Sequence, residues 1–270
     1  MQGTPAPAPT LTEPALYPDL RERVVLVTGG ATGIGESLVR HFVRQGSRVA
    51  FLDVAEEPAL ALVADLTGGE SEPPLFLPCD LRDIDALQRA LGEVQDRLGA
   101  VRVLVNNAAN DDRRAFEEVT PEYWDERMTV NLRHQFFAAQ ALRGGMAAAG
   151  GGSVVNMGSI AWRLGLEGLT HYGTAKAAIV GLTKGLAREL GPDRIRVNCI
   201  EPGLVLTERQ ERLWVTPEFT RKVLEQQSLP DLCQPSDVAR LALFLASEES
   251  AMISSQSFVI DGGSLAGTGG

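Results

Sequence analysis

The chain has 270 residues, of which 44% are hydrophobic and 22% are charged, and its formal net charge is −10. A chain of this length forms one large α/β domain or two small ones and buries about 70 to 75% of its unfolded surface. The negative charge repels nucleic acid and anionic lipid surfaces. No apolar run approaches the roughly 20 residues that cross a bilayer. Neither nucleic acid nor a membrane is therefore an expected partner.

The two ends of the chain differ in composition from the rest. Residues 1–18 are rich in Pro, Ala and Thr, and they lack the basic start and apolar stretch of a secretion signal. We expect a flexible N-terminal arm over 1–18 and a flexible tail over 264–270, because glycine-rich segments have much backbone entropy to lose on ordering. Residues 19–263 are predicted to form one dinucleotide-binding and catalytic domain.

Within that domain, short apolar runs alternate with longer helical segments. The predicted strands are 23–28, 48–53, 75–80, 101–107, 152–157, 195–200 and 257–261. The predicted helices include 33–45, 83–98, 125–149, 171–190 and 236–247. Most of the runs are apolar at successive positions, which is typical of parallel strands covered by helices on both faces. We therefore predict an α/β fold, a single doubly wound (Rossmann) domain with about seven parallel strands.

One segment interrupts the regular alternation. Residues 204–229 contain two apolar-polar stretches and Trp214 before the last strand, and they are longer than a simple crossover requires. Ligands bind at the carboxyl ends of the strands in such sheets. We expect 204–229 to cover a substrate there.

The first strand leads into a glycine-rich turn that is followed by a helix. Glycines in this arrangement permit a tight turn, let the backbone approach a pyrophosphate and bring helix N–H groups toward the anion. The residues predicted to hold the cofactor here are Gly29, Thr32, Gly33, Ile34 and Gly35. A plain strand-to-helix turn is the alternative, but strand, turn and helix occur in the order that a dinucleotide site requires.

Asp53 ends the second strand about 20 residues further on, where an acid accepts hydrogen bonds from the adenosine ribose. A 2′-phosphate about 4 Å from this carboxylate is opposed by about 4 kcal/mol per unit charge at an effective dielectric near 20. Val54 and Ala55 follow, so no basic residue offsets the repulsion. The sequence favours NAD over NADP; a turn-capping role for Asp53 is the alternative.

Two further strand ends supply candidate cofactor contacts. Asp80, with Leu81 beside it, could meet the adenine amino group, but Asp80 and Asp83 also look like the start of a helix. Asn107 and Ala108 follow the fourth strand, where an amide can bridge strand ends and a small side chain leaves room for a ribose.

The stretch HYGTAK sets a tyrosine four residues before a lysine, in a chain with only three residues of each type. On a helix, Tyr172 and Lys176 lie one turn apart on the same face. A phenol that titrates near 10 needs roughly 4 kcal/mol of bias to ionise near 7. An ammonium at about 5 Å supplies about 3 kcal/mol at a dielectric of 20, and a cationic nicotinamide ring adds more. We predict that Lys176 lowers the pKa of Tyr172, which then acts as the base.

Ser159 and Asn131 complete the predicted catalytic group. Ser159 lies just past the fifth strand and is expected to hydrogen-bond the substrate oxygen; a simple turn residue is the alternative. Asn131 is a poor helix former within a helical segment. Its side chain is expected to hold a water that passes protons to Lys176, with a helix kink as the alternative.

These motifs together resemble the short-chain dehydrogenase/reductase family over about residues 20–263. They are TGGATGIG, Asp53, NNAA, Asn131, Ser159, YGTAK and NCIEPGLVLT. The resemblance implies a catalytic tetrad of Asn131, Ser159, Tyr172 and Lys176. It also implies nicotinamide contacts from Pro202, Gly203, Val205 and Thr207, the last reaching the carboxamide. Ala109 departs from the usual glycine, which is expected to shift the nicotinamide pocket slightly.

The stretches NNAANDDR, YWDER, NLRH and GSIAWRLGLEGL are similar to those of bacterial NAD-dependent aldose dehydrogenases of the D-xylose type. That similarity implies oxidation of the anomeric hydroxyl of a sugar to a lactone. A sugar needs several paired groups, because each buried unpaired hydroxyl costs about 1 to 3 kcal/mol. The residues expected to supply them are Asn110, Trp162, Arg209 and Gln210, with Asp111, Arg113 and Trp214 as further candidates.

Two other functions remain open at this point. A 3-oxoacyl-type ketone reductase of the same family that uses NADPH requires basic residues beside Asp53 and an apolar channel. A non-catalytic dinucleotide-binding protein has no need of the tetrad. His171 is expected at the pocket wall or the surface, because on a helix its side chain points about 100° away from that of Tyr172.

Cys79, Cys199 and Cys233 lie far apart and lack the spacing of a metal site or a disulfide framework. We interpret them as small hydrophobic side chains of a cytoplasmic protein and expect no metal. The segments 125–149 and 171–190 are apolar on more than one face, so one face can pack on the sheet and another on a partner chain. A homotetramer built on these helices is expected, as similar proteins form.

Overall fold

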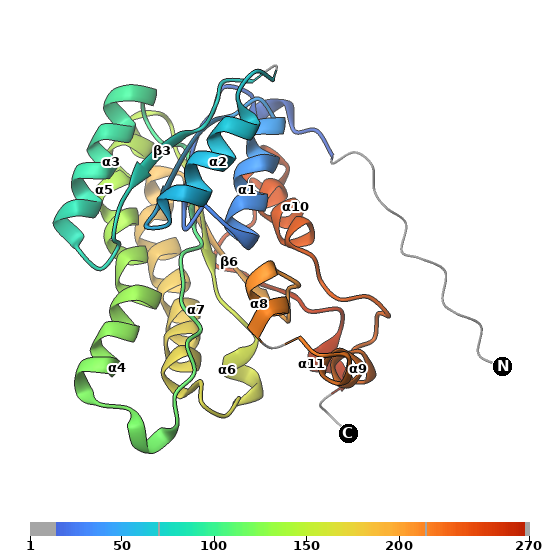
Figure 1. Ribbon diagram of the computed structural model, residues 1–270. Coiled ribbons are helices and arrows are strands. Elements are labelled where there is room, and N and C mark those ends of the chain that lie inside the picture. The colour runs from blue at the N-terminus through green and yellow to red at the C-terminus, as the bar shows by residue number, and fades with distance from the viewer. Residues whose placement is uncertain (1–14, 70, 214, 268–270) are drawn as a thin grey trace.

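The computed structural model describes residues 15–69, 71–213 and 215–267. Its centre is a sheet of seven parallel strands in the order β3-β2-β1-β4-β5-β6-β7 (Figure 1). The strands are β1 Val24–Thr28, β2 Arg48–Asp53, β3 Leu75–Pro78, β4 Val103–Asn106, β5 Gly152–Met157, β6 Ile195–Pro202 and β7 Ser257–Ile260. The predicted α/β fold and strand number are confirmed.

Helices connect the strands and cover both faces of the sheet. They are α1 Gly33–Arg44, α2 Glu56–Leu66, α3 Ile84–Leu98, α4 Pro121–Met128, α5 His134–Ala148, α6 Ala161–Leu164, α7 Thr170–Leu190, α8 Glu208–Leu213, α9 Pro217–Gln226, α10 Pro235–Ala246 and α11 Ser264–Gly267. Short 3-10 turns lie at Pro18–Leu20, Phe116–Glu118, Gly191–Asp193 and Glu248–Ser250. The sequence analysis named neither α2 nor α6, and the boundaries of the strands and helices that it did name differ by a few residues.

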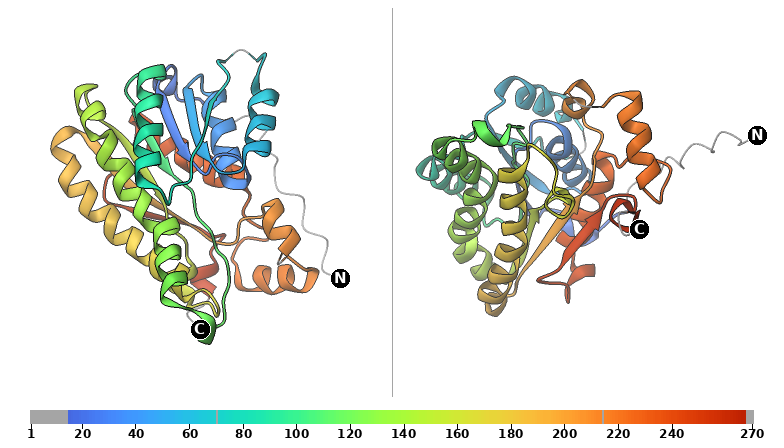
Figure 2. Two further views of the ribbon diagram at one scale, coloured as in Figure 1. Left: turned by 60° about the vertical axis from the view of Figure 1, so that its left-hand side comes forward. Right: turned by 90° about the horizontal axis from the view of Figure 1, so that it is seen from below.

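The alternating direction of strand side chains builds two apolar layers. Val25 and Val27 of β1 face the layer that holds α1, α2 and α10, while Leu26 faces the layer that holds α3, α5 and α7. Figure 2 shows these two helix layers on opposite faces of the sheet. Every residue of β1 is buried. The continuous apolar runs in the sequence therefore reflect burial on both faces.

The predicted helix 125–149 is interrupted. It begins earlier, at α4, where the side chain of Thr120 accepts a hydrogen bond from the amide of Tyr123. A π-helical turn, Thr129–Arg133, then separates α4 from α5. Such turns widen a helix and occur frequently at functional sites. This one carries Asn131.

The segment 204–229 forms α8 and α9, which lie beyond the carboxyl ends of the strands (Figure 1). Val205 forms a parallel bridge with Cys233 at the base of this segment. Trp214 lies outside the described residues. Several side chains of α8 and α9 line the cavity described below.

The ordered domain begins before residue 19. The amide of Tyr17 donates to Gln45 Oε1, whose side-chain amide donates to the carbonyl of Ala15. The predicted flexible arm otherwise falls on residues 1–14, which lie outside the described residues. The predicted C-terminal tail starts with the short helix α11, and residues 268–270 again lie outside the described residues.

The described residues contain neither a helix that is long and apolar enough to cross a membrane nor a group of three potential metal-ligating side chains. All three cysteines are free thiols. Burial is the main cause that raises the pKa of the Cys199 thiol to about 11, so this residue is a poor nucleophile.

Candidate active site

A cavity of about 1780 Å³ runs along the carboxyl ends of the strands. It extends from the turn after β1, past the ends of β2, β4 and β5, to the loop after β6 and the helices α8 and α9. The predicted residues that line it are Gly29, Thr32, Gly33, Ile34, Gly35, Asp53, Asp80, Leu81, Asn107, Ala108, Asn110, Ser159, Tyr172, Lys176, Pro202, Gly203, Val205, Thr207, Arg209 and Gln210. The lining does not include Asn131 or Trp162.

The glycine-rich turn has the backbone geometry that a pyrophosphate site requires. Gly29 and Gly33 have φ angles of 66° and 59°, in the region that favours glycine. A Cβ atom at Gly35 would overlap the carbonyl oxygen of Gly29. The side chain of Thr32 does not cap α1, so the first amides of this helix remain available to an anion.

Asp53 is both a turn residue and a cavity residue. Its Oδ2 accepts a hydrogen bond of 2.9 Å from the amide of Ala31, and its Oδ1 accepts one of 3.0 Å from the amide of Ala55. The carboxylate therefore fixes the end of β2 against the glycine-rich turn. Each oxygen keeps capacity for a further donor such as a ribose hydroxyl.

The sequence analysis missed Arg40, which lines the same cavity from α1. It forms ion pairs with Glu36 at 2.9 Å and with Asp65 on α2. The only signal in the sequence is its place on one face of α1 below the glycine-rich turn. Its partner Asp65 comes from another helix, so the pairing could not be read from spacing.

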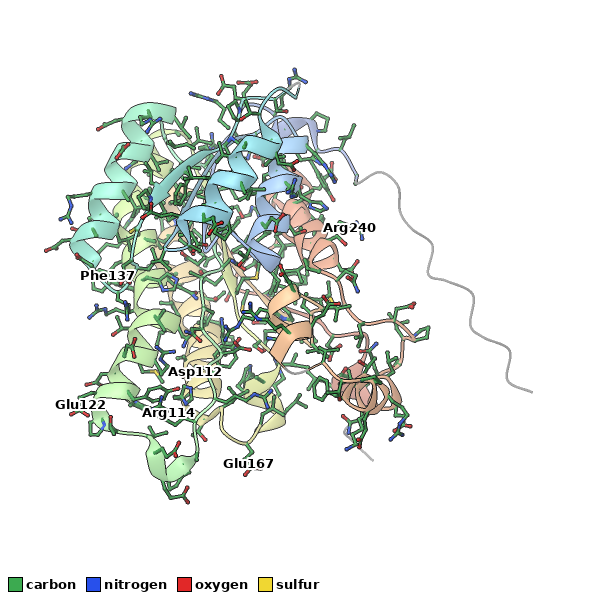
Figure 3. All side chains as sticks on the ribbon, viewed as in Figure 1. Asp112, Arg114, Glu122, Phe137, Glu167 and Arg240 are labelled. Carbon is green, nitrogen blue, oxygen red and sulfur yellow. The ribbon has the colours of Figure 1, made fainter. Side chains whose placement is uncertain are left out.

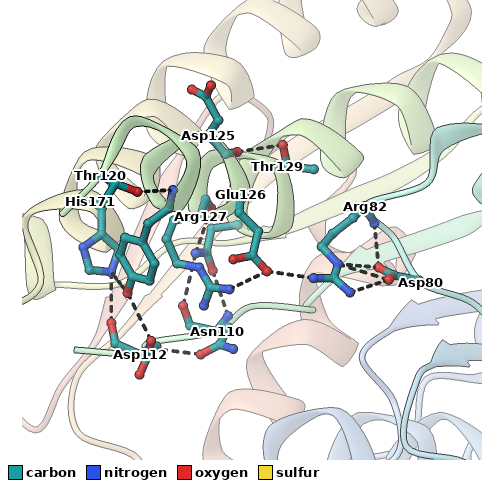
Figure 4. Close-up of polar contacts among 12 residues, drawn as sticks. Asp80, Arg82, Asn110, Asp112, Thr120, Asp125, Glu126, Arg127, Thr129 and His171 are labelled. Carbon is teal, nitrogen blue, oxygen red and sulfur yellow. Dashed lines mark hydrogen bonds and ion pairs between the residues drawn. The ribbon is translucent and has the colours of Figure 1, made fainter. Parts of the chain in front are cut away.

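Asp80 lies in a network of charges that Figure 4 shows. Its carboxylate accepts hydrogen bonds from Arg82, and Arg82 also binds Glu126 of α4 at 2.7 Å. The hydrogen bond from Arg82 is the main cause that lowers the pKa of Asp80. Asp83, not Asp80, caps α3, by accepting from the amide of Ala86. The helix start expected at Asp80 and Asp83 is therefore confirmed with Asp83 as the capping residue, and the adenine contact of Asp80 stays a prediction.

Asn107 joins β4 to the glycine-rich turn. Its side-chain amide donates to the carbonyls of Thr28 and Gly29, at 3.1 and 2.8 Å. Ala108 packs so closely on Gly29 that a Cβ at Gly29 would lie 2.7 Å from its Cα. The predicted bridge between strand ends is confirmed.

The loop after β6 closes the opposite side of the cleft. The amide of Gly203 donates to the carbonyl of Ile260, which fixes the loop on β7. The methyl group of Thr207 lies 3.2 Å from the position of a Cβ at Gly33. Thr207 thus approaches the glycine-rich turn from across the cavity, where it can contact a bound dinucleotide.

Tyr172 and Lys176 lie near the start of α7, beside the end of β5. The Lys176 Nζ lies 5.3 Å from the centre of the Tyr172 ring and donates a hydrogen bond of 2.7 Å to the carbonyl of Met157. Lys176 is buried, with 1% of its surface exposed. Ser159 hydrogen-bonds Tyr172 and also accepts from the amide of Ala161. The structure thus brings three of the four predicted catalytic residues together.

The predicted low pKa of Tyr172 is wrong for the protein chain alone. Burial is the main cause that raises this pKa above its usual value, the carboxylate of Asp111 raises it further, and the hydrogen bond with Ser159 opposes them. Burial also lowers the pKa of Lys176, to about 8. In both groups the loss of water is the largest influence on the pKa, because it disfavours the charged form.

Asn131 joins two segments of backbone through its side-chain amide. Its Oδ1 accepts from the amide of Asn110, and its Nδ2 donates to the carbonyls of Asn110 and Arg127. Both side-chain donors are therefore occupied by backbone, and the amide clamps the loop after β4 to the π-helical turn. Its Oδ1 keeps one lone pair that can accept from a water, and the expectation that this side chain holds a proton-carrying water stays a prediction.

Three of the four predicted substrate residues lie together, and Trp162 lies apart from them. Arg209 and Gln210 of α8 both bind the carboxylate of Asp111, at 3.1 and 2.8 Å. Asn110 precedes Asp111 and is fixed by Asn131. These residues form a polar group beside Tyr172, which the sequence analysis expected for hydroxyl recognition.

Trp162 does not join that group. Its indole Nε1 donates a hydrogen bond of 2.7 Å to Glu201, and the guanidinium of Arg163 stacks 4.5 Å from its ring centre. Glu201 is fully buried and pairs with Arg163 at 2.9 Å. This ion pair ties α6 to β6, and the sequence analysis missed it because the two partners are 38 residues apart.

His171 is buried and points away from the cavity, toward the loop after β4. Its Nε2 hydrogen-bonds the carbonyl of Asp112 at 2.9 Å, while the hydroxyl of Tyr123 donates to the carboxylate of Asp112 (Figure 4). Figure 3 places Asp112 and Arg114 at the end of the molecule where α4 and α6 lie. Arg114 stacks on the Tyr123 ring at 4.1 Å. The cluster supports the loop that carries Asp111.

Known proteins share these features over most of the chain. The sequence pattern of a family described as enoyl-(acyl carrier protein) reductase matches residues 29–264. The chain is 52% identical over 247 residues to a protein of Rhizobium meliloti described as a probable galactose dehydrogenase, with 92% of this chain and 96% of that protein covered. It is 49% identical over 249 residues to D-xylose 1-dehydrogenase of Caulobacter vibrioides, with 92% and 98% covered.

Among solved structures, 3-oxoacyl-(acyl-carrier protein) reductase from Brucella melitensis is similar with a TM-score of 0.84 and 33% identity, over 92% of this chain and 93% of that one. The doubly wound sheet, with a cleft at the carboxyl ends of its strands, is a Rossmann fold. The chain belongs to the short-chain dehydrogenase/reductase family. It is an enzyme that acts on a CH–OH group.

The cofactor cleft leads to a direct test with two glycines. Gly35→Ala places a methyl group on the Gly29 carbonyl, so we expect dinucleotide affinity to fall at least about tenfold, since close backbone approach is lost. NADH fluorescence titration measures it. Gly92→Ala in α3 meets nothing within 4 Å, and it is expected to retain affinity and gain up to about 1 kcal/mol in unfolding free energy. Equal affinities in both variants would contradict the cleft assignment.

Proposed function

We propose that the enzyme oxidises the anomeric hydroxyl of an aldose with NAD to give an aldonolactone. Relatives of about half identical sequence are named for galactose and D-xylose. The observation that carries the proposal is the polar group of Asn110, Asp111, Arg209 and Gln210 beside Tyr172. An acid, an amide and a guanidinium together match the donors and acceptors of a polyol.

The glycine-rich turn supports binding of the cofactor in this cleft, because only a residue without a Cβ atom fits at Gly35. NAD supplies a hydride acceptor at the nicotinamide end of the cleft. Gly33, Ile34 and Gly35 offer backbone amides to its pyrophosphate, and Thr207 faces them from the opposite side. A Cβ at Gly203 would meet Asp261, so the loop after β6 is closely packed.

Tyr172 acts as the general base in the proposed reaction. In this proposal its phenolate removes the proton of the substrate hydroxyl, Ser159 hydrogen-bonds the same oxygen, and Lys176 stabilises the phenolate. Burial works against the phenolate in the chain alone. The positive charge of an oxidised nicotinamide would favour the phenolate, so the proposal couples base formation to cofactor binding.

The polar group favours a sugar over an acyl chain. Each of its polar atoms that an apolar substrate would shield from water without offering a partner costs about 1 to 3 kcal/mol. A 3-oxoacyl-type reductase remains the second candidate, because the family pattern and the Brucella melitensis structure carry reductase descriptions. The Tyr172→Phe variant distinguishes both of these enzyme functions from a non-catalytic dinucleotide-binding role, because only an enzyme has turnover to lose.

We expect reduction of NAD with D-xylose, D-galactose or a related aldose, and little with simple secondary alcohols, in a spectrophotometric screen. Tyr172→Phe is expected to lower kcat by at least about 1,000-fold through loss of the base. Tyr17→Phe, far from the cleft, serves as the matched control and should keep full turnover. Activity on plain alcohols but on no aldose would remove the sugar assignment, and full activity of Tyr172→Phe would remove the catalytic one.

We further propose that NAD is preferred over NADP. Asp53 faces the cavity at the end of β2, and Arg40 is already paired with Glu36 and Asp65. A 2′-phosphate near Asp53 is opposed by about 4 kcal/mol per unit charge, which amounts to a preference on the order of 1,000-fold.

The matched pair Asp53→Asn and Asp85→Asn tests this preference by steady-state kinetics with both cofactors. Asp53→Asn removes the repelling charge, so the ratio of kcat/KM for NAD to that for NADP should fall at least about tenfold. Asp85 lies on α3 outside the cavity, and its variant should keep the wild-type ratio. A wild-type enzyme that prefers NADP would contradict the proposal.

A further inference from the structure

The loop after β4 forms part of the substrate side of the cleft, yet it has no regular secondary structure. Residues 107–115 belong to no helix or strand. Side chains therefore determine the shape of this loop, and Asn131 holds it at Asn110. The next residue, Asp111, carries the carboxylate that binds two side chains of α8. The position of this one carboxylate depends on how the rest of the loop is held.

Asp111 and Asp112 are adjacent carboxylates that face opposite sides of the loop. Asp111 lines the cleft and binds Arg209 at 3.1 Å, whereas the lining does not include Asp112. Figure 4 shows Asp112 beside His171, on the side of α4 and α7. In a free loop, both carboxylates could compete for the same guanidinium, because each attracts it equally. Contacts on the far side of the loop must therefore fix which of the two faces the cleft.

Asp112 is held there at two points. The hydroxyl of Tyr123 donates to its carboxylate at 3.1 Å, and its carbonyl lies 2.9 Å from His171 Nε2. A carbonyl oxygen only accepts, so Nε2 carries the hydrogen and donates it. The Nδ1 of His171 is buried and finds no partner among the residues that the structure describes. The polar contacts of this ring therefore run through Nε2, toward the loop.

Tyr123 and His171 are themselves firmly placed. They are 9% and 1% exposed, and their rings pack edge to face at 5.1 Å. The guanidinium groups of Arg114 and Arg127 lie 4.1 and 5.2 Å from the centre of the Tyr123 ring. His171 directly precedes Tyr172 on α7. The hold on Asp112 therefore ties the loop to the helix that carries the proposed base.

Two stretches singled out from the sequence meet at this contact. NNAANDDR, residues 106–113, contains Asp112, and YWDER, residues 123–127, contains Tyr123. The proposed function uses Asn110 and Asp111 of the first stretch and gives no role to the second. The hydrogen bond between Tyr123 and Asp112 connects the second stretch to the substrate side of the cleft.

We propose that Tyr123 and His171 are positioning residues for substrate recognition, which hold Asp112 on the far side of the loop so that the Asp111 carboxylate meets the sugar hydroxyls. This inference rests on the proposed oxidation of an aldose. A carboxylate has about four acceptor sites, so Asp111 can accept from hydroxyl groups beside its bonds to α8. Without the hold, the loop samples other arrangements, and the substrate affinity falls by the fraction that stays competent.

The first test is Tyr123→Phe, which removes one hydroxyl and keeps the buried ring. Loss of a hydrogen bond to a charged group is expected to raise KM for the best aldose about tenfold. The value of kcat and the affinity for NADH should stay within about twofold, because the lining of the cleft does not include Tyr123. Tyr17→Phe loses the same atom outside that lining and should keep the wild-type KM.

A pair of variants at His171 tests the second contact. His171→Leu removes the donor to the Asp112 carbonyl and is expected to raise KM about fivefold. His171→Gln keeps a nitrogen donor near the position of Nε2 and should recover most of the wild-type KM. Equal KM values in the two variants would exclude a positioning role for this nitrogen.

Asp111→Asn separates positioning from general support of the fold. If Tyr123 acts through Asp111, adding Tyr123→Phe to Asp111→Asn should raise KM by less than about twofold, because the two changes affect the same interaction. A further tenfold rise in the double variant would mean that the effects are independent, and it would overturn the proposal.

Hydrogen exchange of residues 107–115 measures the hold without a substrate. We expect this segment to exchange about tenfold faster in Tyr123→Phe than in the wild type. Wild-type exchange in that variant would overturn the proposal. A wild-type enzyme that oxidises no aldose would instead refute the proposed function, and with it the sugar as the ligand of Asp111, while the exchange rates would still show whether Tyr123 holds the loop.

Discussion

The site depends on one buried charge, the ammonium of Lys176. It is buried beside the carboxyl end of β5, where the Met157 carbonyl is the hydrogen-bond acceptor that the described part of the chain provides. Burial lowers its pKa to about 8, so the cation is only moderately favoured near neutrality. A lysine in this state responds strongly to any added charge or hydrogen bond, because desolvation has removed the shielding that water provides.

Burial acts on Tyr172 in the opposite direction to a positive charge, because it disfavours the phenolate. Its pKa lies above the usual value in the chain alone, with Asp111 adding to the effect of burial. The pair of Arg209 and Gln210 holds Asp111, and thereby links the covering helix α8 to the base. The positive charge of bound NAD and the hydroxyl groups of a bound substrate both act on the Asp111 carboxylate and the Tyr172 phenol. In our account, proton transfer is therefore coupled to the binding of cofactor and substrate.

Sequence reasoning predicted the sheet, the glycine-rich turn and the Tyr172–Lys176 pair, because each has a local pattern: apolar runs, glycine spacing and a helical i, i+4 relation. It failed where the answer depends on partners far along the chain. Glu201 with Trp162, and Asn131 with Asn110, are contacts between separate elements that spacing does not encode. The sign of the Tyr172 pKa shift failed for the related reason that burial is a property of the whole fold. The homotetramer and the cytoplasmic location stay predictions.

The central claim is that positive charge brought by the cofactor, added to that of Lys176, overcomes the burial of Tyr172. Ultraviolet difference titration of the phenol measures this directly, in the free enzyme and in its NAD complex without alcohol, with Tyr172→Phe as the blank for the two other tyrosines. We predict that the Tyr172 signal appears at a pH lower by about two units or more in the complex. Identical titration curves with and without NAD would contradict the account.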